Sequence, residues 1–359
     1  MWSYILRRLL LMIPTLVGIM ALTFLVIQFV PGGPVERMVS LLEQRAQDGA
    51  DGATLSMSRG AGNANNGLYR GASGLDPEQI EALRALYGFD RPPLERFIHM
   101  MGNYLTFNFG ESYYHHRQVL DLVIDKLPVS ISLGMWTFLL TYLISIPLGI
   151  RKAVRHGSRF DAFTSTLVLT GYSIPGFVLG ILLIVLFGGG SFLDLFPMRG
   201  LVSDNWESLA WPARILDYLW HMVLPVTASL VGSFAVMTVL TKNCFLEEIS
   251  KQYVITARAK GVSERTVLYR HVFRNAVIPL VTGFPSSFVA AFFSGSLLIE
   301  TIFSLDGLGL LGYESVINRD YPVVMATLYF YSLLGLLSKL ITDLTYVLVD
   351  PRITFERAQ

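Results

Sequence analysis

The chain has 359 residues, of which 52% are hydrophobic and 15% are charged, with a formal net charge of +1 and a mean hydropathy of +0.50. Soluble domains carry about 25% charged residues, so this composition excludes an ordinary soluble protein and predicts an all-α polytopic membrane protein. The single cysteine, Cys244, excludes an intrachain disulfide and a cysteine metal cluster.

The first apolar segment, residues 9–30, contains no charge and follows Arg7 and Arg8. It is long enough to cross about 30 Å of hydrocarbon. It is also longer than the apolar core of a signal peptide, and no small-residue cleavage site ends it. We therefore predict the first transmembrane helix here, with the N-terminus in the cytoplasm.

Residues 31–128 are polar and mixed, and they are expected to form a small extracytoplasmic helical insert on the membrane surface. Its part 48–74 has few large apolar side chains to bury and is predicted to be flexible. A helix is expected from Asp76 to Gly88, because Pro77 and the acid after it suit a first helical turn. A short amphipathic segment follows at 94–105.

Five further apolar segments of 22 to 27 residues bring the predicted number of transmembrane helices to six. A loop at 242–275 and a tail at 350–359 lie outside them. Several prolines fall in or at the ends of these segments, where neighbouring helices can satisfy the freed carbonyls. The segments are 129–150, 162–187, 219–241, 276–299 and 323–349, and the prolines are Pro147, Pro175, Pro225, Pro279 and Pro285.

The distribution of Lys and Arg predicts the orientation. Residues 1–8, the short connection 151–161, the loop 242–275 and the tail together hold 15, against 3 in the connections on the other side. Short cytoplasmic segments are enriched in basic residues, so both termini and the loop 242–275 are placed in the cytoplasm. The insert holds nine more basic residues, but long translocated segments largely escape this rule.

The loop contains a stretch, residues 253–279, with five basic residues against one acid. We predict a helical hairpin: one helix over 246–260, a left-handed turn at Gly261, and a second helix over 264–275 capped by Ser263, with Glu264 at its positive end. Charge alone leaves two interpretations equally open, a basic cytoplasmic loop or a surface held by another protein.

The order of residues in this stretch resembles the EAA loop of ABC importer permeases, which reads Glu-Ala-Ala, three residues, Gly, and then an apolar run ending in Pro. Ala257, Gly261 and the run 275–279 occupy those positions. Thr-Ala-Arg-Ala-Lys-Gly at 256–261 is similar to the oligopeptide and dipeptide branch. Ile255 departs from the pattern, because it stands where the general motif has Glu, so a carboxylate contact to an ATPase is not implied there.

The resemblance continues in order over nearly the whole chain. Within the branch the chain is most similar to Yej-type permeases of microcin C and oligopeptide importers, through the long polar insert and the Tyr-Tyr-His-His segment at 113–116. The other matching segments are 87–90 with 93–94, 109–112, 127–130, 298–304, 307–309, 319–322 and 350–352.

This resemblance implies the permease of a type I ABC importer that moves peptides across a bacterial inner membrane and carries no cofactor or metal. It also implies three partners: a second homologous permease, ATP-binding cassette ATPase domains and a periplasmic peptide-binding protein. The hairpin would be the ATPase coupling loop. Its residues are Tyr253, Thr256, Ala257, Arg258, Ala259, Lys260, Gly261, Ser263, Glu264, Asn275 and Pro279.

Small residues predict close helix packing at two places, a GxxxG at Gly176 and Gly180 and a ridge on the segment 276–299. Packing is favoured over a gate for both. Glu300 begins the loop after the ridge, and it either dips back toward the pore or lies in a simple connector. The candidate pore or gate residues are Ser287, Ala291, Gly295 and Glu300.

Lys339 and Asp343 lie four residues apart in the last apolar segment. A structural ion pair is favoured, and a proton relay would make the protein a proton-coupled secondary transporter instead. No Lys is followed by Ser or Thr, so a P-loop ATPase is excluded and energy must come from a partner. We expect no enzyme: there is no HExxH, and the Gly-Ala-Ser-Gly at 71–74 lies in the flexible part. Nucleic-acid binding is not expected, because topology accounts for the basic residues.

Overall fold

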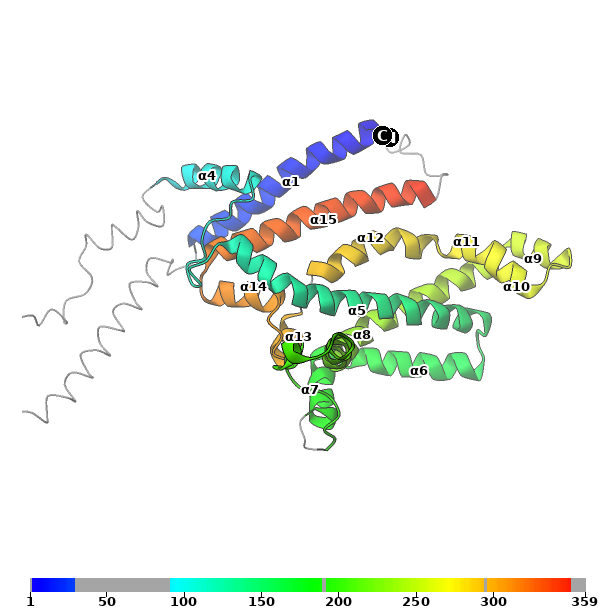
Figure 1. The fold of residues 1–359 in the computed structure, drawn as a ribbon. Coiled ribbons are helices and arrows are strands. Elements are labelled where there is room, and N and C mark those ends of the chain that lie inside the picture. Colours follow the sequence, from blue (N-terminus) through cyan, green and yellow to red (C-terminus); the bar gives the residue numbers. More distant parts are fainter. Residues whose placement is uncertain (1, 30–90, 189–191, 294–295, 350–359) are drawn as a thin grey trace, which may run out of the picture. The chain divides into compact units, whose positions relative to one another are not determined.

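The computed structural model describes residues 2–29, 91–188, 192–293 and 296–349 (Figure 1). These residues are helical with connecting turns, and within them β-pairing is limited to one isolated bridge between Glu111 and Gln118. The all-α prediction is confirmed for them. The flexible part 48–74, the expected helix 76–88, Gly295 and the tail 350–359 lie outside the described residues.

The chain divides into two compact units whose boundaries fall inside helices. The first comprises residues 1–13, 123–314 and 330–359, and the second comprises residues 14–122 and 315–329. Both candidate functional regions of the sequence, the hairpin and the small-residue ridge, belong to the first unit.

Among the described residues, four helices are long and apolar enough to cross a membrane. They are α1 (Trp2–Phe29), α5 (Val119–Val154), α8 (Trp211–Ile249) and α15 (Tyr321–Val349). Each contains nearly all of one predicted span, and α5 and α8 run well past theirs, to 36 and 39 residues. At 1.5 Å per residue, both helices are longer than the about 30 Å of a hydrocarbon core, and the hairpin begins where α8 ends.

The span predicted at 162–187 is not one helix. It consists of α6 (Arg159–Ser173) and α7 (Gly176–Phe187), which meet at 94°. Ile174 adopts an extended conformation (φ −89°, ψ 119°) before Pro175, as expected for a residue that precedes proline. Pro175 therefore separates two helices, which corrects the prediction that the bundle accommodates this proline within one span.

The span predicted at 276–299 is also interrupted. Helix α12 (Ile278–Phe293) is followed, after residues 294 and 295, by the short α13 (Leu297–Ile302), with Ser296 out of helical geometry. The loop after it contains a further apolar helix, α14 (Leu308–Ile317), which the sequence analysis did not predict. The described helices therefore give four long spans, or five when the bent α6–α7 pair is counted as one.

The predicted close packing at the GxxxG is confirmed. A Cβ atom on Gly176 would lie 2.9 Å from the carbonyl oxygen of Ala228 on α8, and one on Gly180 would lie 3.3 Å from the ring of Phe303. Around this contact, buried apolar side chains of α8 and α13 form one core cluster with Leu133 of α5. The first unit is therefore held together by α5, α7, α8 and α13.

The second unit contains α4 (Pro93–Leu105), which agrees with the amphipathic segment predicted at 94–105. Tyr104 at its end packs edge to face against Phe109 and Tyr329, with ring centroids 4.8 and 5.4 Å apart. The Asp320 carboxylate accepts hydrogen bonds from the Ser112 hydroxyl (2.5 Å) and the Tyr113 N–H (3.0 Å). These contacts fix the turn that leads into α5.

Candidate functional site

The predicted hairpin is present at the end of α8, with one difference in its first arm. The helix predicted over 246–260 is divided, because α8 ends at Ile249 and α9 (Gln252–Ala259) begins after an extended Lys251 (φ −73°, ψ 150°). The second arm is helical throughout, through α10 (Glu264–Thr266), the π-helical turn η2 (Val267–Val272) and α11 (Phe273–Ala276). These elements lie together in Figure 1.

The turn of the hairpin has the predicted geometry. Gly261 adopts φ +77°, in the left-handed region, and the Ser263 hydroxyl accepts a hydrogen bond from the Thr266 N–H at 3.4 Å. Across the turn, the Arg258 guanidinium lies 2.9 Å from the Glu264 carboxylate. Glu264, the only acid of the stretch 253–279, thus joins the two arms. The other basic side chains of the tip have no acid of this stretch to pair with, so they are available to another protein.

The base of the hairpin is fixed by Glu248, which the sequence analysis did not single out. Its carboxylate lies 2.6 Å from Lys251 Nζ and accepts a hydrogen bond from the Tyr253 hydroxyl at 2.8 Å. Asn275 Nδ2 donates to the same hydroxyl at 3.1 Å, so both arms meet there. Hydrogen bonding to Glu248 raises the pKa of Lys251, and burial raises the pKa of Tyr253. The available sequence signal was the i, i+3 spacing of Glu248 and Lys251.

The underside of the hairpin is apolar and fully packed. Val254 and Val272 are 0% exposed, and Ala257 is buried beside them. With Phe245 of α8 and Ile150 of α5 they belong to one core cluster. A displacement of the hairpin must therefore also move the ends of α5 and α8, because a packed apolar contact transmits strain.

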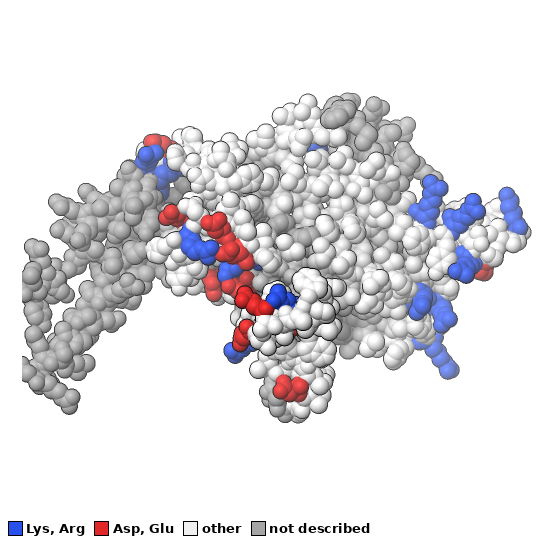
Figure 2. Space-filling view, viewed as in Figure 1, with Lys and Arg blue, Asp and Glu red and all other residues white. Residues whose placement is uncertain are grey.

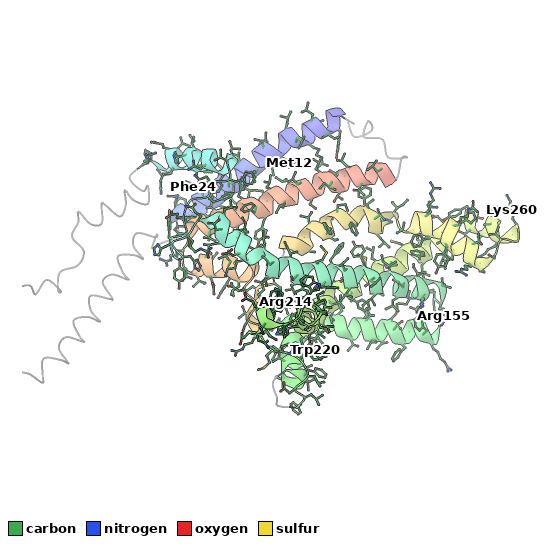
Figure 3. All side chains as sticks on the ribbon, in the orientation of Figure 1. Met12, Phe24, Arg155, Arg214, Trp220 and Lys260 are labelled. Atoms are coloured by element: carbon green, nitrogen blue, oxygen red, sulfur yellow. The ribbon has the colours of Figure 1, made fainter. Side chains whose placement is uncertain are left out.

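The outer face of the hairpin is exposed and basic. Lys and Arg side chains gather over this end of the molecule in Figure 2, and Lys260 points outward at the tip in Figure 3. Ile255, where the general motif has Glu, is 49% exposed. The remaining predicted coupling residues on this face are Thr256, Arg258, Ala259, Gly261, Ser263 and Glu264, all of them exposed, as is Pro279 at the start of α12.

A cavity of about 890 Å³ lies within the first unit, bounded by α5, α6, α7, α8, α12 and α13. Ser287 and Ala291 of the predicted ridge line it, together with Glu300. The wall carries hydroxyl groups, and Glu300 is the one acidic or basic side chain among its described lining residues. The hydroxyl-bearing residues include Ser130, Thr137, Thr141, Tyr142, Ser229 and Ser233.

The Glu300 carboxylate is directed toward the start of α14. It is 0% exposed, and its Oε2 accepts a hydrogen bond from the Leu310 N–H at 2.7 Å. A Cβ atom on Gly307 would lie 2.7 Å from its Cδ, so a side chain there would have to displace the carboxylate. Glu300 therefore braces the turn between α13 and α14 at the edge of the cavity.

The wall of the cavity also contains a close helix approach at Ala291, where the small-residue ridge predicts one, although its partner was not predicted. A Cβ atom on Gly134 of α5 would lie 1.4 Å from the carbonyl oxygen of Ala291 on α12. Two helix backbones can touch in this way only where a residue has no side chain. A lone glycine in an apolar segment gave no indication of its partner.

Residues 145–355 match the family described as binding-protein-dependent transport system inner membrane components. That is more than half of the chain. The chain belongs to this family. It is 58% identical to the peptidoglycan transport system permease protein YejB of Agrobacterium fabrum C58, over 99% of both chains.

Two further relatives are also permease proteins of transport systems. It is 53% identical to the inner membrane ABC transporter permease protein YejB of Escherichia coli O157:H7, over 99% of this chain and all of the relative. It is 31% identical to the dipeptide transport system permease protein DppB of Escherichia coli K12, with the same coverage of each. The predicted resemblance to Yej-type and peptide permeases is therefore confirmed.

The structure corrects the predicted Lys339–Asp343 pair of this permease. The Asp343 carboxylate lies 2.7 Å from Arg8 of α1 and accepts a hydrogen bond from the Tyr4 hydroxyl at 3.0 Å. Among the described residues, no ion pair joins it to Lys339, which is exposed. The three residues instead attach α1 to α15. The alternative of a proton-coupled secondary transporter is not supported, either by this geometry or by the family.

Proposed function

We propose that this permease is the membrane subunit of an ATP-driven importer of peptides, including oligopeptides and microcin C-like peptide conjugates. Its relatives are named for the transport of peptidoglycan and of dipeptides. Peptide chains are the chemistry that these two solutes share, and the 58% identity over the whole chain supports a similar solute.

The observation that supports coupling to a separate ATPase is the structure of the hairpin. Its base is held by Glu248, Tyr253 and Asn275, its underside is packed on α5 and α8, and its tip is exposed and basic. A rigid element of this kind suits a groove in a separate ATPase, whose closure would displace the hairpin and rock the helices behind it. The ATP is hydrolysed by that partner, and the permease itself is not catalytic.

The cavity supplies the second part of the proposal. Its hydroxyl-bearing, largely neutral wall suits a path that lets a solute pass without holding it. We infer that it is half of the translocation pore and that a second, homologous permease completes it. We propose that Ser287, Ala291 and Glu300 form its gate, together with Gly295, which lies outside the described residues. A periplasmic peptide-binding protein would deliver the solute from the other side of the membrane.

The proposed topology keeps six spans with both termini in the cytoplasm, in the type I importer arrangement. The third span is the bent α6–α7 pair, and α12 with α13 forms the fifth. The segment 31–128 is proposed as the extracytoplasmic insert. The basic hairpin then lies on the cytoplasmic side, where the excess of Lys and Arg is expected.

The test is purification of the tagged chain in a mild detergent, followed by mass spectrometry of the bound proteins. We expect a P-loop ATPase and a second permease in near-equal amounts. We also expect the ATPase to be lost when residues 257–261 are replaced by a Gly-Ser linker. A chain that is recovered alone and still accumulates peptides in vesicles would contradict the proposal.

A further inference from the structure

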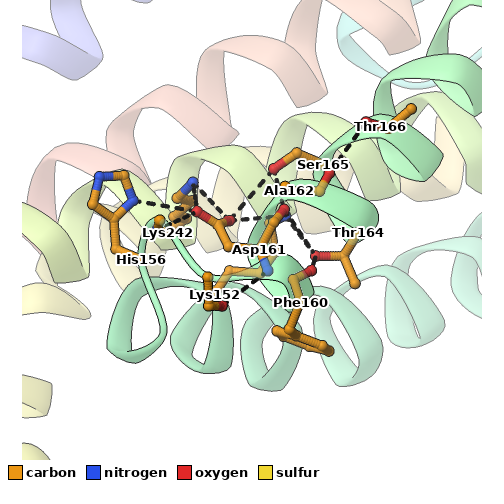
Figure 4. A network of polar contacts seen from close by, with 11 residues as sticks. Lys152, His156, Phe160, Asp161, Ala162, Thr164, Ser165, Thr166 and Lys242 are labelled. Atoms are coloured by element: carbon orange, nitrogen blue, oxygen red, sulfur yellow. Dashed lines mark hydrogen bonds and ion pairs between the residues drawn. The ribbon is translucent and has the colours of Figure 1, made fainter.

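A cluster of charged side chains joins α5, α6 and α8 close to the hairpin (Figure 4). At its centre is Asp161, in the first turn of α6. Both oxygens of its carboxylate lie 2.8 Å from Lys242 Nζ of α8. Lys152 Nζ of α5 lies 3.3 Å from the same carboxylate, and so does His156 Nδ1. One carboxylate therefore connects three helices.

The cluster is buried, which distinguishes it from a surface ion pair. The side chains of Lys152, Asp161 and Lys242 are 1%, 7% and 15% exposed. Lys152 Nζ also donates hydrogen bonds to the hydroxyls of Thr164 and Ser165, both at 2.8 Å. Charges that are withdrawn from water in this way are strongly destabilised when a partner is removed, so they keep their helices in register.

Asp161 also shapes the turn between α5 and α6. Its N–H donates to the Ser158 hydroxyl, and its carboxylate accepts a hydrogen bond from the Gly157 N–H, both at 3.2 Å. This is a reciprocal cap of a helix N-terminus, where a carboxylate is favoured. The turn and the link to α8 thus depend on the same side chain.

The position of the cluster relates the hairpin to the cavity. Lys242 precedes Glu248, the residue that holds the hairpin base, by six residues on α8. Helix α6 carries Asp161 near its start and Tyr172 near its end, and Tyr172 lines the cavity. Helix α5 contributes Thr141 to the same wall. The helix that bears the hairpin is therefore tied, through Asp161, to two helices that line the cavity.

We propose that Asp161 is a positioning residue that makes α5, α6 and α8 move as one body when the hairpin is displaced. The proposal rests on the proposed coupling role of the hairpin. Without the link, displacement of the hairpin still moves α8, to which it is packed, but α6 no longer follows. ATP hydrolysis then continues while the cavity wall fails to rearrange.

The charges of the cluster allow a test in which the net charge is unchanged. Asp161→Asn combined with Lys242→Gln removes one anion and one cation and cuts the link to α8. Lys152 keeps its hydroxyl partners Thr164 and Ser165. Lys242→Met is a second variant, which leaves Lys152 and Asp161 as a balanced pair and decides the question if the double variant does not assemble.

The transporter, assembled with its ATPase and second permease, is reconstituted in vesicles, and ATP hydrolysis is measured together with uptake of radiolabelled trialanine. We expect the ATP hydrolysed per peptide to rise about fivefold or more in the link-cutting variants, because allosteric couplings typically lie in the range of about 5- to 150-fold. Asp161→Glu, which keeps the charge, should restore coupling. Lys339→Met, at an exposed lysine on α15, is the matched control and should behave as the wild type.

Cys244 provides a second measurement that a general folding defect would not reproduce. It is the single cysteine of the chain and lies half-buried on α8 two residues after Lys242. Trypsin releases it in the peptide 243–251 of the wild type and in the peptide 215–251 of the variants that lack Lys242. We expect nucleotide to change its alkylation rate in the double variant as it does in the wild type, because α8 still follows the hairpin.

Wild-type coupling in both link-cutting variants would overturn the proposal, and so would loss of the nucleotide effect at Cys244 together with loss of uptake. A wild-type chain that binds no ATPase or takes up no peptide would instead overturn the proposed function, and this inference with it. The two failures are distinguished by the wild-type measurement alone.

Discussion

Gly261 is the residue at which the hairpin depends most directly on backbone conformation. Its φ of +77° lies where side chains are disfavoured, yet a Cβ atom there would meet nothing within 4 Å. A substitution therefore acts through strain of about 1 kcal/mol or more and not through a clash. The turn can relieve that strain only by changing the direction of the tip.

We predict that Gly261→Val leaves the protein inserted but uncouples peptide uptake from ATP hydrolysis, as measured in the same vesicles. Gly110→Val is the matched control, because Gly110 has φ +76° and equally open surroundings outside the hairpin. Gly261→Asn should retain most activity, since Asn tolerates the left-handed region. Normal uptake by Gly261→Val would show that the turn geometry is unimportant.

Tyr253 joins the two arms through one hydroxyl group, bonded to Glu248 and Asn275. The hydroxyl also lies 3.3 Å from the His271 carbonyl oxygen. Replacement of Tyr253 by Phe removes these contacts, and a hydrogen bond contributes about 0.5–1.5 kcal/mol. We predict that hydrogen exchange over residues 252–276 becomes about tenfold faster, which corresponds to about 1.4 kcal/mol. Tyr269→Phe is the control, because Tyr269 is an exposed tyrosine on the second arm of the same hairpin. Equal exchange in both variants would contradict the structural role of the Tyr253 hydroxyl.

At the scale of elements, apolar length and charge predicted the long helices, because both are properties of consecutive residues. The interruptions depend on tertiary contacts. Pro175 ends a helix because α7 packs on Ala228 through Gly176, so the bend is supported. Helix α14 begins where the Glu300 carboxylate meets the Leu310 N–H, a pairing ten residues apart that hydropathy does not report.

The contact between α5 and α12 gives a prediction at this scale. Gly134→Ala would place a Cβ atom 1.4 Å from the Ala291 carbonyl oxygen, so the helices must part, and overpacking of this kind costs about 1–3 kcal/mol. We expect a lower thermal unfolding temperature in detergent. Gly283→Ala on α12 is the control, because its added Cβ meets nothing within 4 Å and Ala favours a helix by about 0.8–1 kcal/mol. An unfolding temperature for Gly134→Ala as high as that of the control would contradict the close approach.

For the candidate site, the sequence predicted the tip of the hairpin. The contacts that attach the hairpin to α5 and α8 became apparent only in the structure. Gly261 and Ser263 were predictable because turn and cap preferences are local. Glu248 and Asp161 were not, because their roles arise from side chains on other elements. A pairing based on spacing alone failed at Lys339 and Asp343, since a residue of another helix, Arg8, lies closer to the carboxylate.

The contact of Asp343 with Arg8 and Tyr4 leads to a test of whether ATP or a proton gradient drives transport by the whole molecule. Asp343 is engaged by Arg8 and Tyr4, and the ion pair is partly exposed, so its loss should cost less than about 1 kcal/mol. We predict that Asp343→Asn in the assembled transporter slightly lowers the thermal unfolding temperature and leaves ATP-driven peptide uptake unchanged. A protonophore should leave the uptake of both wild type and variant unaffected at fixed ATP. Lys339→Met should change neither quantity. Uptake that collapses with the proton gradient, and that is abolished by Asp343→Asn, would show that protons drive the transport.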